Sequence, residues 1–135
     1  MLFLDTSALL KRYVDEDGTG MVVAAMAGDD VWLASALAGA ETQVAIARLP
    51  VAEDERARQL RRYEEDWERF RVVPVDAECL RDAARIAADQ RIRIVDAIHL
   101  AAAARLPQPF RFLTFDPDQA EAARALGFDV RGVGS

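Results

Sequence analysis

The fold is decided by the stretch Leu2-Phe3-Leu4-Asp5-Thr6-Ser7, in which a short apolar run ends at a carboxylate. A run of this kind, closed by polar residues, is typical of a buried β-strand. Similar short apolar runs recur along the chain and alternate with segments of helical periodicity. The pattern predicts an α/β domain with a mainly parallel central sheet flanked by helices.

The expected elements alternate along the whole chain. Strands are expected at residues 2–4, 31–33, 72–75, 112–114 and 128–130. Helices are expected after Asp5 with Thr6 or Ser7 as the cap, at 21–27, from a Ser35 cap to about residue 48, at 52–70, from an Asp76 cap onward, at 96–104 and at 117–126.

Helical periodicity also predicts which side chains face inward. Leu37 and Val44 are expected on the buried side of the helix after Ser35, and Leu80 on that of the helix after Asp76. The long helix carries a stripe made of Leu60, Tyr63, Trp67 and Phe70. We interpret this stripe as core or as a surface for a partner helix, and a platform for stacking RNA bases is the alternative.

Length and composition limit the class of protein. With 135 residues, of which 52% are hydrophobic, the chain is expected to form one domain over residues 1–135. No apolar run approaches the roughly 20 residues of a membrane helix. The apolar start lacks a basic leader and is interrupted by Asp5, so no signal peptide is expected. The single cysteine, Cys79, cannot form an intrachain disulfide, which favours a reducing cytoplasm.

The net charge of −6 argues against the broad basic surface that drives non-specific binding to duplexes. It does not exclude nucleic acid, because bound divalent cations and a few arginines can receive phosphate groups. Lys11 is the only lysine, so nearly all basic side chains are arginines. Arginine is the better bidentate ligand for phosphate.

Four acids stand out by their positions. Asp5 and Asp116 directly follow expected strands, Asp96 opens a helix, and Glu41 lies early in another helix. The carboxyl ends of parallel strands form one edge, where sites in open α/β sheets occur. Acids that converge there repel one another and are costly to desolvate, so we expect a cation among them.

Oxygen ligands suit Mg²⁺ and Mn²⁺, which can activate a water and stabilise the leaving oxygen of a phosphodiester. Zinc is not indicated, because the chain has a single histidine, His99, and a single cysteine. Gly-rich phosphate loops of the P-loop or dinucleotide type are absent from the sequence. The acids therefore predict a metal-dependent nuclease.

Each of these residues also has an ordinary structural interpretation. Asp116 followed by Pro117 is a good helix start, and Asp96 could equally cap its helix. Glu41 could be a solvated or ion-paired helix residue. His99 lies three residues after Asp96 and could orient a carboxylate or simply be a hydrogen-bonded, half-buried side chain.

The chain resembles the PIN domain family and, within it, the VapC-type toxins of toxin–antitoxin pairs. The segments that carry the resemblance are Leu2–Leu9, Ser35–Glu41, Ile94–Ala101 and Leu113–Asp116 followed by Ala122–Gly127. Their order and the length of the chain match the family. The resemblance implies a single PIN-like domain that acts as an endoribonuclease and is toxic when free.

The resemblance also implies roles for individual residues. It assigns catalysis to Asp5, Glu41, Asp96 and Asp116, with Asp5, Asp96 and Asp116 as ligands of Mg²⁺, for which Mn²⁺ can substitute. Thr6 and Thr114 match positions that often hold a supporting hydroxyl. It further implies an RNA substrate, a cognate VapB-like antitoxin, a homodimer and a cytoplasmic location.

Three other functions stay open. The chain could be a PIN-type nuclease outside a toxin–antitoxin system, or a non-catalytic acidic binding domain. It could also be a phosphatase or phosphoacceptor with Asp5 as the nucleophile. That last class usually has a second acid two residues later, where this chain has Ser7, and a lysine in the C-terminal half, which is absent here.

Overall fold

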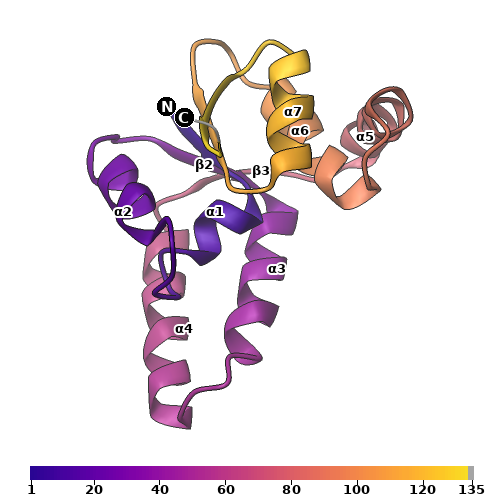
Figure 1. The fold of residues 1–135 in the computed structure, drawn as a ribbon. Helices are drawn as coiled ribbons and strands as arrows, with labels where there is room; N and C mark the ends of the chain where they lie inside the picture. Colours follow the sequence, from indigo (N-terminus) through magenta and orange to yellow (C-terminus); the bar gives the residue numbers. More distant parts are fainter. Residues whose placement is uncertain (134–135) are drawn as a thin grey trace.

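A computed structural model of the chain describes residues 1–133. In this part of the chain five strands form one sheet in the order β3-β2-β1-β4-β5, and every neighbouring pair is parallel (Figure 1). The strands are β1 (Leu2–Leu4), β2 (Trp32–Ser35), β3 (Arg71–Val73), β4 (Arg111–Thr114) and β5 (Asp129–Gly132). The predicted parallel α/β sheet is therefore confirmed.

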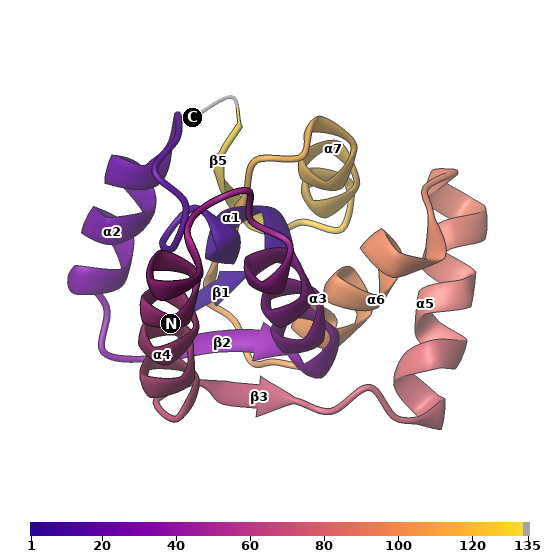
Figure 2. The same cartoon turned by 90° about the horizontal axis from the view of Figure 1, so that it is seen from below.

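Helices cover both faces of the sheet, as the buried run of β1 requires. They are α1 (Thr6–Leu10), α2 (Thr19–Ala27), α3 (Ala36–Ala47), α4 (Glu53–Trp67), α5 (Ala77–Gln90), α6 (Ile94–Ala104) and α7 (Pro117–Ala125). One core cluster joins the sheet to α1–α4, and the other joins it to α5–α7. Seen from below, α2 and α5 lie on opposite sides of the molecule (Figure 2).

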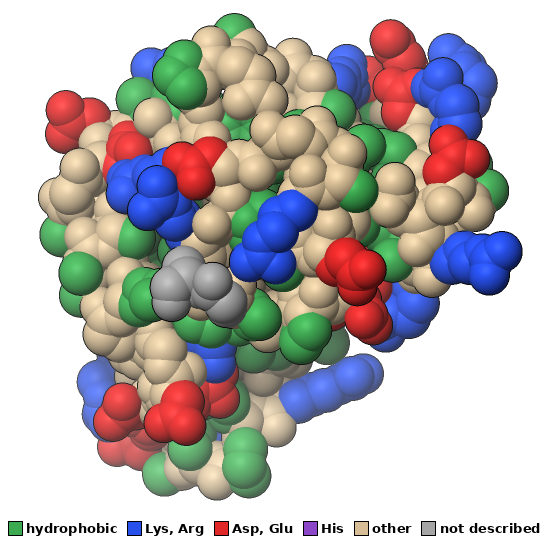
Figure 3. Space-filling model, turned by 45° about the horizontal axis from the view of Figure 1, so that its top comes forward, with side chains coloured by type: hydrophobic (Ala, Val, Ile, Leu, Met, Phe, Trp, Pro, Cys, Tyr) green, Lys and Arg blue, Asp and Glu red, His purple; other side chains and the backbone are tan. Residues whose placement is uncertain are grey.

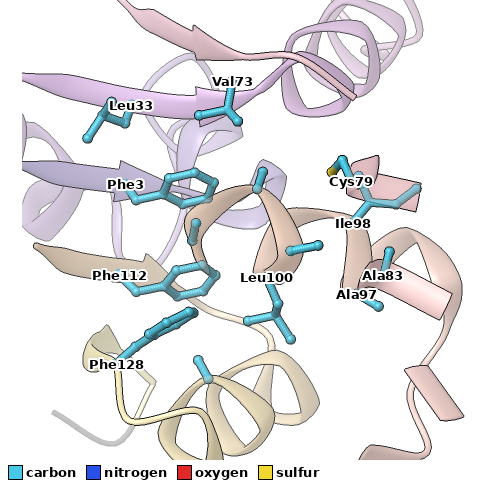
Figure 4. Packing of buried hydrophobic residues seen from close by; sticks show 14 of the residues in the cluster. Phe3, Leu33, Val73, Cys79, Ala83, Ala97, Ile98, Leu100, Phe112 and Phe128 are labelled. Atoms are coloured by element: carbon cyan, nitrogen blue, oxygen red, sulfur yellow. The ribbon is translucent and has the colours of Figure 1, made fainter. Parts of the chain in front are cut away.

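Side chains alternate along β1, so this strand contributes residues to both core clusters. Phe3 packs in the cluster with α6, whereas Leu2 and Leu4 pack in the cluster with α1–α4. The Phe3 and Phe112 rings stack with centroids 5.3 Å apart, and Phe128 continues the stack at 5.7 Å from Phe112 (Figure 4). All three residues of β1 are fully buried, so a polar side chain introduced there would leave a hydrogen-bonding group without a partner.

The aromatic stripe of α4 belongs to the core. Tyr63 and Phe70 are 5% and 7% exposed, and the Tyr63 hydroxyl donates to the Gly39 carbonyl on α3 at 3.0 Å. Trp67 packs between them against the same stretch of α3. The interpretation as core is confirmed, because Tyr63 and Phe70 are buried and the half-buried Leu60 and Trp67 pack against the same core cluster, which does not leave the stripe free as a platform for RNA bases.

Two predicted inward positions are wrong. Val44 is 47% exposed and Leu80 is 44% exposed. The fully buried positions are Ala38, Gly39, Thr42 and Ile46 on α3, and Cys79 and Ala83 on α5, whereas Leu37 packs against the core as expected. Hydrophobicity alone does not decide which of several apolar side chains on such an alanine-rich helix faces the core.

Charges of both signs are interspersed over the face seen in Figure 3, with apolar side chains between them. This mixture fits the absence of a broad basic surface inferred from the net charge. Within residues 1–133, no helix is both long enough and apolar enough to cross a membrane. Helix α2 exposes two large apolar side chains, Met21 at 44% and Val23 at 41%.

The contact between α3 and α4 gives a stability test. A Cβ on Gly39 would lie 2.5 Å from the Trp67 ring, so Gly39→Ala forces the ring to move. Overpacking of this kind costs about 1–3 kcal/mol. On α2, a Cβ on Gly20 meets nothing within 4 Å, and alanine is favoured over glycine in a helix by up to about 1 kcal/mol.

We therefore expect Gly39→Ala to lower the free energy of unfolding and Gly20→Ala, as the matched control, to raise it slightly. Urea unfolding followed by circular dichroism measures both. Equal stability of the two variants would mean that the Trp67 ring adapts without cost.

Candidate active site

The acids lie at the edge of the sheet where the order of the strands reverses. The chain runs from β1 outward through β2 and β3, then returns to place β4 on the other side of β1. Ligand sites of open parallel sheets form at such a switch point, beyond the carboxyl ends of the strands. Asp5 directly follows β1, and Asp116 lies two residues after β4.

Asp5 is a buried carboxylate with three donors. It is 3% exposed and accepts hydrogen bonds from the Ser7 hydroxyl at 2.7 Å, from the Ala8 amide at 3.0 Å and from the Thr114 hydroxyl. Burial raises the pKa of Asp5, and the bonds from Thr114 and Ser7 act in the opposite direction. The bond to Ala8 makes Asp5 the N-cap of α1, so the predicted cap at Thr6 or Ser7 is wrong.

Thr114 connects Asp5 to Asp116. Its hydroxyl donates to Asp5 Oδ2 and accepts from the Asp116 amide at 3.1 Å. Asp116 Oδ1 accepts from the amides of Asp118 and Gln119, which confirms Asp116 as the cap of α7 with Pro117 in the first turn. Its other oxygen, Oδ2, makes no hydrogen bond within the described part of the chain. Asp116 therefore caps a helix and still presents one carboxylate oxygen.

A second network holds Glu41. The Thr6 hydroxyl donates to Glu41 Oε1 at 2.6 Å, and His99 Nε2 lies 3.1 Å from the same oxygen. His99 Nδ1 lies 2.9 Å from the hydroxyl of Ser35, which also accepts from the Ala38 amide. Since Thr6 directly follows Asp5, the two networks meet at the end of β1.

The partners of His99 fix the tautomer of a neutral ring. A carboxylate only accepts, so Nε2 must carry the proton that is shared with Glu41. Ser35 then donates to Nδ1 while accepting from Ala38, so both ring nitrogens of His99 have a partner. The hydrogen bond from His99 lowers the pKa of Glu41, and the Thr6 bond adds to this effect. The predicted hydrogen-bonded role of His99 is confirmed, although the side chain is fully rather than half buried, at 3% exposure.

Asp96 does not cap its helix. Helix α6 begins at Ile94 with Arg93 as its N-cap, which places Asp96 in the first turn. The Arg93 guanidinium holds both oxygens of Asp96, with Nε 3.1 Å from Oδ2 and Nη2 3.3 Å from Oδ1. The capping interpretation is therefore wrong, and Asp96 is half of a bidentate ion pair.

Arg93 lies beside the acids, although the sequence analysis did not single it out. The hydrogen bonds to Asp96 and its charge raise the pKa of Arg93, and the charges of Asp116 and Glu41 act in the same direction. One guanidinium thus lies within electrostatic reach of three of the four acids. The spacing of three residues between Arg93 and Asp96 is a recognisable local signal. The nearness to Asp116 and Glu41 depends on the tertiary fold.

The oxygen atoms at this edge are suitable ligands for a hard divalent cation, and the cationic side chain of Arg93 already lies beside them. Within the described residues, Glu41 and Asp116 each keep one oxygen without a hydrogen-bond partner, and the other oxygen atoms at this edge belong to carboxylates and hydroxyls. In residues 1–133 no three His, Cys, Asp or Glu side chains lie close enough to form a complete cluster. Mg²⁺ usually takes one or two carboxylates and keeps several waters, so it does not require such a cluster.

A hollow of about 490 Å³ lies beside Glu41. Its walls are formed by Thr6, Ala40, Glu41, Val44, Ala45 and Arg48. Val44, which was expected inside the core but is exposed, is part of this lining and lies beside Glu41. The hollow combines an apolar floor with one carboxylate and one guanidinium.

The PIN domain family matches residues 2–125, which is nearly the whole chain. The chain belongs to the PIN domain family. Two relatives from Mycobacterium tuberculosis are Ribonuclease VapC45 of strain CDC 1551 / Oshkosh and Ribonuclease VapC49 of strain ATCC 25618 / H37Rv. Each is 32% identical over 113 residues, which cover 81% of this chain and 78% of the relative. The recognition of a VapC-type PIN domain is confirmed.

Solved structures share the PIN fold over almost the full length. VapC20 of Mycobacterium tuberculosis, described as a sarcin–ricin loop cleaving toxin, has a TM-score of 0.75 at 21% identity and covers 97% of this chain and 99% of its own. FitAcB from Neisseria gonorrhoeae has a TM-score of 0.72 at 22% identity, with 96% of each chain covered. At these identities the likeness concerns the fold.

The lowered pKa of Glu41 predicts a pH-dependent contribution to stability. The folded protein favours the ionised carboxylate, so ionised Glu41 adds stability above the ordinary carboxyl pKa of about 4.3. This contribution is lost as the pH falls through the lowered pKa of the folded state. We expect Glu41→Gln to melt below wild type at neutral pH, with a gap that narrows between about pH 5 and 3.

Thermal melts in EDTA measure this gap without a contribution from divalent cations. A gap that stays constant across the range would contradict the role of the Glu41 charge. Equal melting temperatures at neutral pH would show that the Thr6 and His99 bonds add nothing to the folded state.

Proposed function

We propose that this chain is a metal-dependent endoribonuclease and the toxin of a toxin–antitoxin pair. The observation that carries the proposal is the linked set of carboxylates at the carboxyl edge of β1 and β4. Its support comes from the PIN family and from relatives that are named ribonucleases at 32% identity. Acids joined by hydroxyls at this edge are suited to placing a cation against a phosphodiester.

The proposed roles follow from how each acid is held. Asp5, Asp96 and Asp116 would hold Mg²⁺ or Mn²⁺, and Thr114 keeps Asp5 and Asp116 in register. When bound, the cation supplies Lewis-acid stabilisation of charge at the phosphate and lowers the pKa of a water. Glu41, whose pKa is lowered by the bonds from His99 and Thr6, would accept a proton from the attacking water.

The acid-to-amide test uses two neighbouring aspartates on α7. Asp116→Asn removes a proposed ligand, and Asn caps a helix about as well as Asp. Asp118→Asn makes the same change of charge two residues away. With antitoxin-free protein and Mn²⁺, we expect Asp116→Asn to slow cleavage of single-stranded RNA on the order of a hundredfold or more. Asp118→Asn should retain activity near that of wild type.

EDTA should abolish wild-type cleavage, and added Mn²⁺ should restore it. Full activity in EDTA would contradict the metal mechanism. Failure of metal-loaded wild type to cleave any single-stranded RNA would favour the non-catalytic binding domain. The phosphoacceptor alternative is disfavoured by geometry, because Asp5 is 3% exposed and both of its oxygens accept hydrogen bonds.

The proposed partners are a cognate VapB-like antitoxin and a second copy of the chain, in the cytoplasm. Some solved structures of the same fold are complexes, including a toxin–antitoxin complex from Klebsiella pneumoniae. On this chain, Met21 and Val23 of α2 offer exposed apolar surface for an interface. The acids would attract a basic side chain from an antitoxin tail, because a cation placed among carboxylates favours their ionised form.

We expect light scattering to give twice the chain mass at high micromolar concentration, and we expect the antitoxin to block RNA cleavage in proportion to its amount. A monomer across that range would overturn the dimer. An antitoxin that binds fully but leaves cleavage unchanged would overturn the proposal that its tail covers the acids.

A further inference from the structure

We propose that Arg93 serves two partners in turn: it holds Asp96 until a divalent cation takes that carboxylate, and it then binds a phosphate of the RNA. This inference rests on the proposed nuclease function and deepens it, because it names the residue that receives the RNA backbone. It also makes metal binding and RNA binding depend on each other.

The position of Arg93 leaves its side chain available for this role. As the N-cap of α6 it makes no side-chain capping bond, so its guanidinium is not needed to start the helix. The Arg93 side chain is 74% exposed, whereas the Asp96 side chain that it holds is only 14% exposed. The exposed partner of the pair is therefore the cation, which faces solvent beside the acids.

The ion pair is suited to exchange. Ion pairs at the surface contribute little to stability and Arg93 is the exposed partner of this one, so a divalent cation can replace the guanidinium at Asp96. The released guanidinium keeps a planar fork of donors that matches phosphate as well as carboxylate. Among residues 1–133, no lysine or arginine other than Arg93 donates a hydrogen bond to any of the four acids.

The chain needs such a residue because its charge opposes RNA. A net charge of −6 and four acids at the proposed site repel a phosphate backbone. Asp116 and Glu41 also lie within electrostatic reach of Arg93, so a phosphate paired with Arg93 would lie next to the remaining acids. The phosphodiester to be cleaved would thereby lie where a cation can contact both the protein and the RNA.

Exchange at Asp96 couples the two ligands. A cation bound at Asp96 frees Arg93 for RNA, and RNA bound at Arg93 frees Asp96 for the cation. By linkage, each ligand must then raise the affinity for the other by the same factor. Without Arg93 this part of the coupling disappears, while the carboxylates themselves remain.

The first experiment measures Mn²⁺ affinity without RNA, from the signal of free Mn²⁺ in electron paramagnetic resonance. Arg93→Gln removes the competing cation and should tighten Mn²⁺ binding by roughly three- to tenfold. Arg91→Gln is the matched control, since it makes the same change of charge two residues earlier in the exposed turn after α5. Arg93→Lys, which keeps the charge without the fork, should fall between wild type and Arg93→Gln.

The second experiment measures kcat and KM for cleavage of a single-stranded RNA at saturating Mn²⁺. Arg93→Gln should raise KM on the order of tenfold, because a charge-assisted bond to phosphate is lost. Arg91→Gln should change KM much less. Tighter Mn²⁺ binding together with a raised KM supports the proposal, because a purely structural role of Arg93 would not improve metal affinity.

Two outcomes overturn the inference about Arg93 and leave the nuclease proposal intact. In one, wild type cleaves RNA and Arg93→Gln matches Arg91→Gln in Mn²⁺ affinity. In the other, Arg93→Gln tightens Mn²⁺ binding but its KM matches that of Arg91→Gln. Wild type that neither binds Mn²⁺ nor cleaves RNA overturns both proposals together.

Discussion

The burial of one carboxylate, Asp5, is the constraint on which the candidate site depends. β1 is the central strand, so the residue that follows it cannot reach bulk water. A carboxylate in such a place is costly unless donors surround it. Ser7, the Ala8 amide and Thr114 are those donors, and they tie the start of α1 to the end of β4. Because Thr114 also accepts from the Asp116 amide, the same constraint sets where α7 begins.

The alanine-rich α6 gives the second part of the arrangement. Its Ala97 and Ala101–Ala103 are fully buried, so the helix lies close against the sheet. That closeness brings His99 between Ser35 at the end of β2 and Glu41 on α3. Asp96, one turn earlier, comes out near the surface and meets Arg93. One helix therefore presents a buried donor, His99, to one acid and holds another acid, Asp96, in an ion pair with an exposed arginine.

Much of this could be predicted from the sequence, for reasons that are physical. Short apolar runs alternating with helical periodicity determine a parallel sheet, and parallel strands place Asp5 and Asp116 at one edge. The exposure of Val44 and Leu80 could not be predicted, because both helices carry several apolar residues and their small side chains let another part of the surface face the core. The cap of α1 could not be predicted from the hydroxyls alone, because Asp5, Thr6 and Ser7 are all good caps and only the structure shows that Asp5 accepts from the Ala8 amide.

The position of Arg93 relative to the acids could be predicted only in part. Its pairing with Asp96 is local, so helix spacing alone suggests it. Its nearness to Asp116 and Glu41 joins three helices that are distant in sequence, and only the packing of α6 determines it. The sequence predicted that a cation would be found among the acids. The structure places a guanidinium of the chain itself there.

Asp5 is both a proposed site residue and the cap of α1, and this affects how such a gene would lose its activity. A lineage that benefits from losing the activity can do so through many substitutions, but they are not equivalent. Replacing Asp5 with a residue that cannot cap a helix also removes the cap of α1 and a partner of Thr114, which destabilises the fold. Replacing Asp96 breaks the ion pair with the exposed Arg93, the partner that the structure shows for it within residues 1–133, so a smaller loss of stability is expected. Silent relatives that persist as stable proteins should therefore have lost the acid on α6 far more often than the acid after β1.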